Sequence, residues 1–290
     1  RDIPVMTGFK TIKSSMGEIG NTGVEFTLRT VNVDTKDLNW TTGFTFWLNR
    51  NKLIHLYGED FDGDGKEDSD EPSGRIIGKS LGAIWGYRQD GIVQESDVDY
   101  IAANGVKAGQ PKYVDIDGNG TVGAEDREIL GYDRPNFKLN MSNTVSYRNL
   151  ELYAMLTGTA GGNGYYLKNN ANAYMSNGSG VFNTNSIYIP WWTPENQSNV
   201  YPSATFAGDS RFQGLQSRAY IRLQDVTLSY NFRQPWVKDM KISSLKVFLS
   251  GKNLFTVTGW EGGDPEVGNG VRAGDYPVIT SLTAGVNISF

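Results

Sequence analysis

Two short acidic segments, 60–71 and 115–126, have the residue spacing with the most specific chemistry in this sequence. Each has oxygen-bearing side chains at its first, third and fifth positions and a glycine at its sixth. This spacing matches the EF-hand loop, in which such side chains bind Ca²⁺ and the glycine permits a sharp turn. Hard oxygen ligands favour Ca²⁺ over a transition metal. The candidate ligands are Asp60, Asp62, Asp64, Lys66, Asp68 and Glu71 in the first segment and Asp115, Asp117, Asn119, Thr121 and Asp126 in the second.

The later positions of the two segments differ. The seventh residues, Lys66 and Thr121, would offer backbone carbonyls. The first segment has Asp68 at the ninth position and Glu71 at the twelfth, whereas the second has Asp126 at the twelfth, where Glu is usual. The alternative is a pair of solvated turns, because Asp and Gly are common in turns in any case. Helices flanking the segments are not evident in the sequence, so we expect calcium to order a long loop rather than to act as a sensor.

Catalytic chemistry has little support in the sequence. His55 is the only histidine and there is no cysteine, so a histidine-based triad or zinc site is not expected. A glycosidase would need two carboxylates about 5–10 Å apart in a cleft, and plentiful Asp and Glu leave that alternative open. Because the acidic residues follow calcium-like spacing, we predict a binding protein and not an enzyme.

Four aromatic residues form a candidate substrate-binding group. They lie in segment 160–215 among many Asn, Gly and Ser residues, which suits stacking on sugars and hydrogen bonding to hydroxyls. The alternatives are packing within the loop or contact with another protein. The residues are Tyr165, Tyr166, Trp191 and Trp192.

The segments that position these residues alternate apolar and polar side chains. In the last twelve residues, Leu282, Ala284, Val286, Ile288 and Phe290 share one face, and small polar residues share the other. This period of two predicts a β-strand with one apolar face. Where the apolar face switches within 218–232, a bulge or the membrane boundary would explain the change. Seven strands are predicted at about 22–34, 38–51, 137–147, 150–159, 216–232, 243–258 and 279–290.

The connections between these strands alternate in length. Short turns at 34–37, 147–149 and 233–242 alternate with long connections at 52–136, 160–215 and 259–278. No run of 18 apolar residues occurs, which excludes a transmembrane helix. Short turns at one end and long loops at the other are typical of outer-membrane barrels. If both the first and last strands run towards the periplasm, the strand number is odd: seven, or nine if 82–94 pairs with residues near 110–115.

Several motifs, in this order along the chain, resemble the SusC-like (RagA-like) TonB-dependent transporters of Bacteroidetes. They include Asn21-Thr22-Gly23, Trp85-Gly86-Tyr87, Asp115-Ile116-Asp117-Gly118-Asn119-Gly120, Gly131-Tyr132-Asp133-Arg134-Pro135, Tyr220-Ile221-Arg222-Leu223 and Gly251-Lys252-Asn253-Leu254-Phe255. The resemblance implies an all-β fold in which residues 1–290 form part of an antiparallel transmembrane barrel of about 22 strands. It further implies that the chain is the C-terminal part of the protein, with the plug domain and the TonB-contacting segment outside it.

We therefore expect active import of oligosaccharide or peptide nutrients across the outer membrane, with TonB and a SusD-like surface lipoprotein as partners and lipid around the barrel. The alternative is a calcium-dependent extracellular β-rich module that binds glycans or acts as an adhesin. A formal net charge of −5 without a basic stripe argues against nucleic acid.

The long connection 52–136 should lie outside the cell as a large loop. Its stretch from Leu81 to Val93 is too rich in apolar residues to remain in water, so it should pack on the barrel or on another protein. We expect it to dock the lipoprotein.

Overall fold

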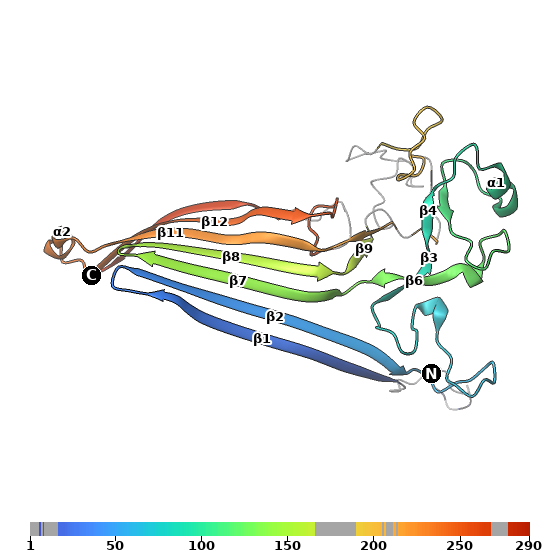
Figure 1. Cartoon of the computed structure of the whole chain (residues 1–290), viewed down its shortest axis with the longest axis horizontal. Helices are drawn as coiled ribbons and strands as arrows, with labels where there is room; N and C mark the ends of the chain where they lie inside the picture. Colours follow the sequence, from blue (N-terminus) through green and yellow to red (C-terminus); the bar gives the residue numbers. More distant parts are fainter. Residues whose placement is uncertain are drawn as a thin grey trace.

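The computed structural model describes residues 6, 8, 17–165, 190–204, 206, 211–212, 214–267 and 278–290. Within these residues, seven long antiparallel strands form one sheet, and they follow each other in chain order (Figure 1). A meander of this kind brings strands that are close in sequence side by side. The strands are β1 (Glu18–Asp34), β2 (Leu38–His55), β7 (Pro135–Tyr147), β8 (Leu150–Gly161), β11 (Tyr220–Phe232), β12 (Ser244–Thr258) and β13 (Ser281–Ser289). The seven predicted strands are confirmed, with small shifts at their ends.

A bulge in β11 explains the switch of its apolar face. The register of β11 shifts between Leu223 and Asp225 against both β8 and β12. An inserted residue changes the parity of the strand, so apolar side chains on either side of it stay on one face. Ile221 and Leu223 before the bulge therefore share a face with Val226 after it.

The two ends of the sheet differ in the length of their connections. At one end, short turns join β1 to β2 and β7 to β8, and a turn with the helix α2 (Pro235–Asp239) joins β11 to β12 (Figure 1). In the β7–β8 turn, Arg148 has a φ of +52°, a left-handed conformation that allows the chain to reverse within two residues. The long connections all start and finish at the other end, as the sequence predicts.

The connection 52–136 contains short elements of its own. They are η2 (Glu71–Ser73), β3 (Ala83–Tyr87), β4 (Gln89–Ile92), α1 (Val98–Asn104), β5 (Pro111–Tyr113), η3 (Ala124–Asp126) and β6 (Arg127–Tyr132). β3 pairs with β6 and β4 pairs with β5, in separate two-stranded sheets. The predicted extra hairpin therefore splits in two and does not extend the main sheet, which leaves seven long strands. A further small sheet pairs β9 (Asn163–Tyr165) with β10 (Leu215–Ser217).

Segment 52–136 packs against residues 190–204. Ile92 and Val93 are almost wholly buried, and the Ile92 amide donates to Asn199 Oδ1 at 2.9 Å. The Ser203 amide donates to the Gly109 carbonyl at 2.7 Å. Apolar residues of the stretch that suggested a docking surface thus form a core within the chain. The stretch is covered only in part, because Ile84, Ile92 and Val93 are buried whereas Leu81 is 41% exposed. Docking of the lipoprotein by segment 52–136 therefore stays a prediction.

None of the helices in the described part of the chain combines the length and the apolar character needed to cross a membrane.

Candidate functional site

The two faces of the main sheet carry different side chains. One row across six strands is apolar, and its members are Trp40, Val145, Leu152, Leu228, Leu249 and Ala284. The adjacent row faces the opposite way and contains Thr41, Thr144, Tyr153, Thr227, Ser250 and Thr283. Large apolar side chains on the first face are open to the surroundings, for example Leu249, which is 55% exposed. Such a continuous exposed apolar surface is suited to lipid rather than to water.

The polar face holds an ion pair between two strands. Lys246 Nζ lies 3.1 Å from Glu151 Oε1, and Ser229 on the intervening strand β11 lies near the same carboxylate. The two opposite charges thus bridge across β11, which pairs with both β8 and β12. This face can therefore border water or a polar solute.

A second charged group fastens the connection after β12 to the polar face of β11. Arg222 is only 4% exposed and contacts Asp264 Oδ1 at 2.9 Å and Glu266 Oε2 at 2.8 Å. The Tyr220 hydroxyl donates to Glu266 Oε1 at 2.7 Å. Burying a guanidinium requires carboxylate partners of this kind. The ion pairs therefore hold segment 264–266 over the sheet.

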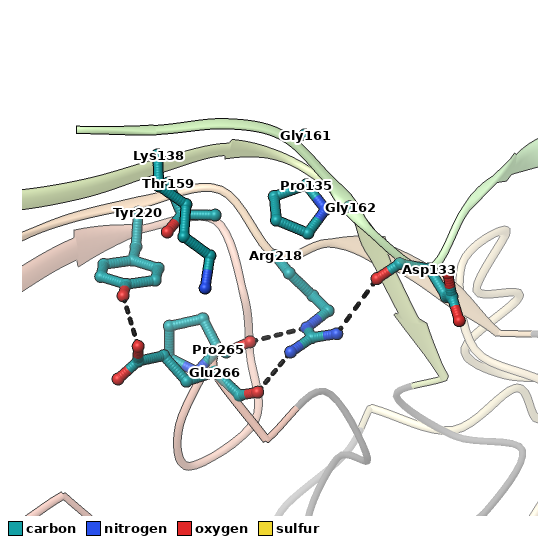
Figure 2. Close-up of a pocket in the computed structure, with 10 residues that line it drawn as sticks. All are labelled: Asp133, Pro135, Lys138, Thr159, Gly161, Gly162, Arg218, Tyr220, Pro265 and Glu266. Carbon is teal, nitrogen blue, oxygen red and sulfur yellow. Dashed lines mark hydrogen bonds between the residues drawn. The ribbon is translucent and has the colours of Figure 1, made fainter. Parts of the chain in front are cut away.

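A small pocket of about 130 Å³ lies beside this group (Figure 2). Arg218 donates from Nε to the Pro265 carbonyl at 2.7 Å, from Nη1 to the Asp133 carbonyl at 3.3 Å, and from Nη2 to the Glu266 carbonyl. One guanidinium thus joins three backbone carbonyls from two connections. The pocket has room for a small polar group only, so we regard Arg218 as a structural clamp.

The two acidic segments fold into loops with the same hydrogen-bond pattern. In the first, Asp60 accepts from the amides of Gly63 and Gly65, at 2.7 and 3.0 Å. In the second, Asp115 accepts from Gly118 and Gly120, at 2.8 and 2.7 Å. The third and fifth residues also accept from the amides two positions later. These hydrogen bonds between neighbouring residues define the turn at the start of each loop.

Three carboxylates converge in each loop. Asp60, Asp62 and Asp68 can bring one oxygen each within 4.8 Å of the others. Asp115, Asp117 and Asp126 do the same in the second loop. Each group is compatible with a hard cation that takes oxygen ligands.

The remaining predicted ligands lie outside these two groups of acidic side chains. Asp64 Oδ2 is 3.6 Å from Lys66 Nζ, and Glu71 begins η2. Asn119 Oδ1 accepts from the Thr121 amide at 2.8 Å and hydroxyl at 2.7 Å. In the first loop, the ninth residue, Asp68, belongs to the converging carboxylates, whereas the twelfth residue, Glu71, does not. We call the residue that completes each group of carboxylates the closing residue.

Backbone amides hold two carboxylates of these loops in the charged form. Hydrogen bonds from backbone amides lower the pKa of Glu67 from 4.5 to about 2, and the bond from the Gly58 amide has the largest effect. Glu67 accepts from the amides of Leu56 and Gly58 at 2.7 and 2.6 Å and contacts His55 Nδ1 at 3.1 Å. In the second loop, the Gly123 amide is the main cause of a lowered pKa of Asp126. Both loops thus keep negative charge at any ordinary pH.

Three of the four aromatic candidates lie within the described residues, and their surroundings differ. Trp192 is buried, donates from Nε1 to Gln94 Oε1 at 2.9 Å and lies close against Gly109. Its indole packs inside the loops, so it is not a free stacking surface. Tyr165 lies in β9, and Trp191 accepts from Asn196 through its backbone carbonyl. Tyr166 lies outside the described residues.

Sequence reasoning missed Glu67, Arg218 and the carboxylates that pair with Arg222. Arg222 lies in a predicted strand, but Asp264 and Glu266 lie in a Gly-rich connection without periodicity. Only the folded chain brings them within contact distance. Glu67 has no place in the metal-loop spacing, so no signal distinguished it.

Comparison with known proteins shows which family has sequences similar to this chain. The chain is 31% identical to TonB-dependent receptor P26 of Formosa agariphila, over 99% of this chain and 31% of that protein. It is 25% identical to TonB-dependent receptor SusC of Bacteroides thetaiotaomicron, over 99% of this chain and 28% of SusC. The chain is a homologue of SusC-like TonB-dependent receptors. The resemblance predicted from the sequence motifs is therefore confirmed.

A solved transporter structure has a fold that agrees with the sheet described above. The RagAB peptide importer in its open-open state superimposes with a TM-score of 0.74 at 21% identity, covering 100% of this chain and 31% of the importer chain. At this identity the match shows the fold, an antiparallel portion of a transporter barrel. No family model matches the chain. The chain spans roughly three-tenths of the length of the SusC-like receptors it matches.

Proposed function

We propose that this chain forms part of the wall and the outer loops of an outer-membrane barrel that imports nutrients. The observation that carries the proposal is the division of the sheet into an exposed apolar face and a polar face with ion pairs. Lipid would cover the first face, and the second would border the transport path. The homology to SusC-like TonB-dependent receptors supports the same function.

In this proposal, energy comes from TonB and the chain performs no covalent chemistry. A SusD-like surface lipoprotein would close over the end of the sheet where 52–136 and 190–204 pack together. The imported nutrient would be an oligosaccharide or a peptide. The similarity to an importer of peptides supports the second choice only through fold, because the sequence identity is 21%.

Uptake by the source organism tests this function. Deletion of the full-length gene should abolish growth on, and uptake of, one labelled class of oligomer, and deletion of TonB should do the same. The protein should fractionate with outer membranes and change its mobility on SDS gels after boiling. Recovery in a soluble fraction, or unchanged uptake of oligosaccharide and of peptide, would contradict the proposal.

We propose further that Ca²⁺ binds both acidic loops and orders segment 52–136. Converging carboxylates in each loop and the shared backbone pattern support it. The cation would offset the repulsion between the carboxylates. Titration calorimetry of the full-length protein should detect two calcium sites. Heat changes that are the same with and without the loop carboxylates would rule out both.

The alternative, a soluble calcium-dependent adhesin or glycan-binding module, has less support. A soluble module should cover the apolar face of its sheet with another layer of its own. Within the described residues, apolar side chains along the sheet, such as Val247 and Leu282, are exposed.

A further inference from the structure

The main sheet splits where β2 and β7 part. Their pairing ends at Trp47 and Lys138, but β2 continues to His55. Beyond the split, the Leu53 amide donates to the Lys79 carbonyl and its carbonyl accepts from Gly78, both at 2.8 Å. Segment 78–79 therefore replaces β7 as the neighbour of β2 and leaves a gap beside the start of β7.

A basic pocket of about 430 Å³ fills this gap. Four of its lining side chains are cations, and no Asp or Glu lines it among the described residues. The chain as a whole carries a net charge of −5, so the positive charge of this pocket is opposite in sign to that of the chain. Like charges that share a pocket without a counter-charge favour an anionic ligand. The four cations are Arg50, Lys52, Lys79 and Arg134.

The position of the pocket relative to the apolar face identifies the kind of anion. The β1–β2 register is unbroken from Lys52 to Thr41, so alternate residues of β2 keep to one side. Arg50 and Lys52 therefore lie on the same side of β2 as Phe46 and Leu48, directly beyond the apolar part of the strand. Arg50 is held in place because its Nη1 donates to the Asn136 carbonyl at 2.7 Å.

Cations that follow an apolar stretch on the same face lie at the level of lipid headgroups in a membrane protein. The pocket is at the end of the sheet with the long connections, which is the outer end in the proposed function. We propose that the basic pocket binds a phosphate-bearing headgroup of a glycolipid in the outer leaflet. This inference rests on the proposed function, because it requires the apolar face to lie in an outer membrane.

Guanidinium and ammonium groups gathered in one pocket are suited to phosphate oxygens. An acidic oligosaccharide offers similar oxygens, but it would travel along the polar face. Asn49 and Asn51 also line the pocket and lie on the polar side of β2, but the cations Arg50 and Lys52 lie on the apolar side, which favours the lipid.

Binding of lipid A to the full-length protein in nanodiscs tests the proposal. The pocket variant carries Arg50→Gln, Lys52→Gln, Lys79→Gln and Arg134→Gln. The control variant removes equal charge from exposed cations elsewhere and carries Lys36→Gln, Lys107→Gln, Arg233→Gln and Lys241→Gln. The double variant Lys52→Gln/Lys79→Gln leaves the Arg50 bond to Asn136 intact and serves if the fourfold variant does not fold. Fully dephosphorylated lipid A and a sulfated oligosaccharide are the comparison ligands.

We expect the Kd for phosphorylated lipid A to rise about tenfold or more in the pocket variant and to stay within about twofold in the control. The double variant should show a smaller rise of the same sign. Dephosphorylated lipid A should bind the wild-type protein as weakly as phosphorylated lipid A binds the pocket variant.

Equal affinity of wild-type and pocket variants for phosphorylated lipid A would overturn the proposal. So would loss of oligosaccharide binding alone in the pocket variant, which would assign the pocket to substrate. Either result in a protein that still fractionates with outer membranes contradicts this inference and leaves the proposed function standing. Failure to fractionate there contradicts the proposed function itself.

Discussion

The two acidic loops have the same backbone hydrogen-bond pattern in their first halves but differ in the residue that closes each loop. Asp60 and Asp115 make matching pairs of bonds to the glycine amides that follow them. The first loop is closed by Asp68, eight residues after Asp60. Asp68 accepts a hydrogen bond from the Phe61 amide at 2.6 Å. The second is closed by Asp126, eleven residues after Asp115. Short-range spacing thus determines the first half of each loop, and the surrounding chain determines the second half.

Burial is the main difference between the closing residues. Asp126 is fully buried and accepts from the amides of Ile116, Asp117 and Gly123, at 2.6, 3.3 and 2.7 Å. Asp68 is only partly buried, and Glu67 beside it fixes the start of its loop instead. In the second loop, one carboxylate, Asp126, both accepts the backbone hydrogen bonds and joins the converging group. In the first loop, Glu67 accepts the bonds from the Leu56 and Gly58 amides, and Asp68 joins the converging group.

Replacing Asp126 should have the largest effect. Asp126→Asn leaves buried amides without a charged acceptor and removes one converging carboxylate. In an Asp60→Asn background, where only the second loop binds, we expect calcium affinity measured by calorimetry to fall about a hundredfold or more. The neighbouring exposed Glu125→Gln is the matched control and should change little. Equal losses for the two variants would contradict the central role of Asp126.

Asp68→Asn should have a smaller effect on the first loop. Asp68 accepts a hydrogen bond from the Phe61 amide and is partly exposed, so water can replace part of what is lost. In an Asp115→Asn background, we expect calcium affinity to fall about tenfold. Glu59→Gln, on an exposed neighbour, is the control. A loss as large as that for Asp126→Asn would show that the two loops close alike.

Acid should loosen the first loop through Glu67. Its pKa falls from 4.5 to about 2 in the folded chain, so its stabilising contribution is complete above pH 4.5 and is lost as the pH falls towards 2. Protection of the Leu56 and Gly58 amides from hydrogen exchange should decline over that range. In Glu67→Gln, protection should already be low at pH 7 and vary little with pH. If the variant shows the same dependence of protection on pH as the wild-type protein, Glu67 is not the group that holds the first loop.

Glu71→Gln should have the smallest effect. The EF-hand spacing predicts Glu71 as the twelfth-position ligand, but it lies outside the carboxylate group of the first loop. In an Asp115→Asn background, calcium affinity should remain within about twofold of the parent. A tenfold loss would restore the prediction from spacing and contradict the structure.

The strands could be predicted from the sequence because their apolar and polar side chains alternate with a strict period of two. The bulge near Gln224 was also foreseeable, since the apolar parity changes between Leu223 and Val226. Both features depend on neighbouring residues, which a local pattern records.

Contacts between distant segments left no such pattern. Trp192 packs beside Gly109 and bonds with Gln94, nearly a hundred residues away in the chain. The partners of Arg222 lie in a connection without periodicity. The closing carboxylate of the first loop depends on where the chain returns after Gly65, which spacing alone does not determine.

Spin-label accessibility along β7 tests the central claim most directly. The 290 residues contain no cysteine, so single labels can be placed at Leu139, Asn140, Met141 and Ser142 of the full-length protein in lipid bilayers. We expect labels at 139 and 141 to be relaxed by oxygen dissolved in lipid, and labels at 140 and 142 to be relaxed by a water-soluble nickel complex. Four labels that all respond to the nickel complex, without alternation, would contradict a sheet with one face in lipid.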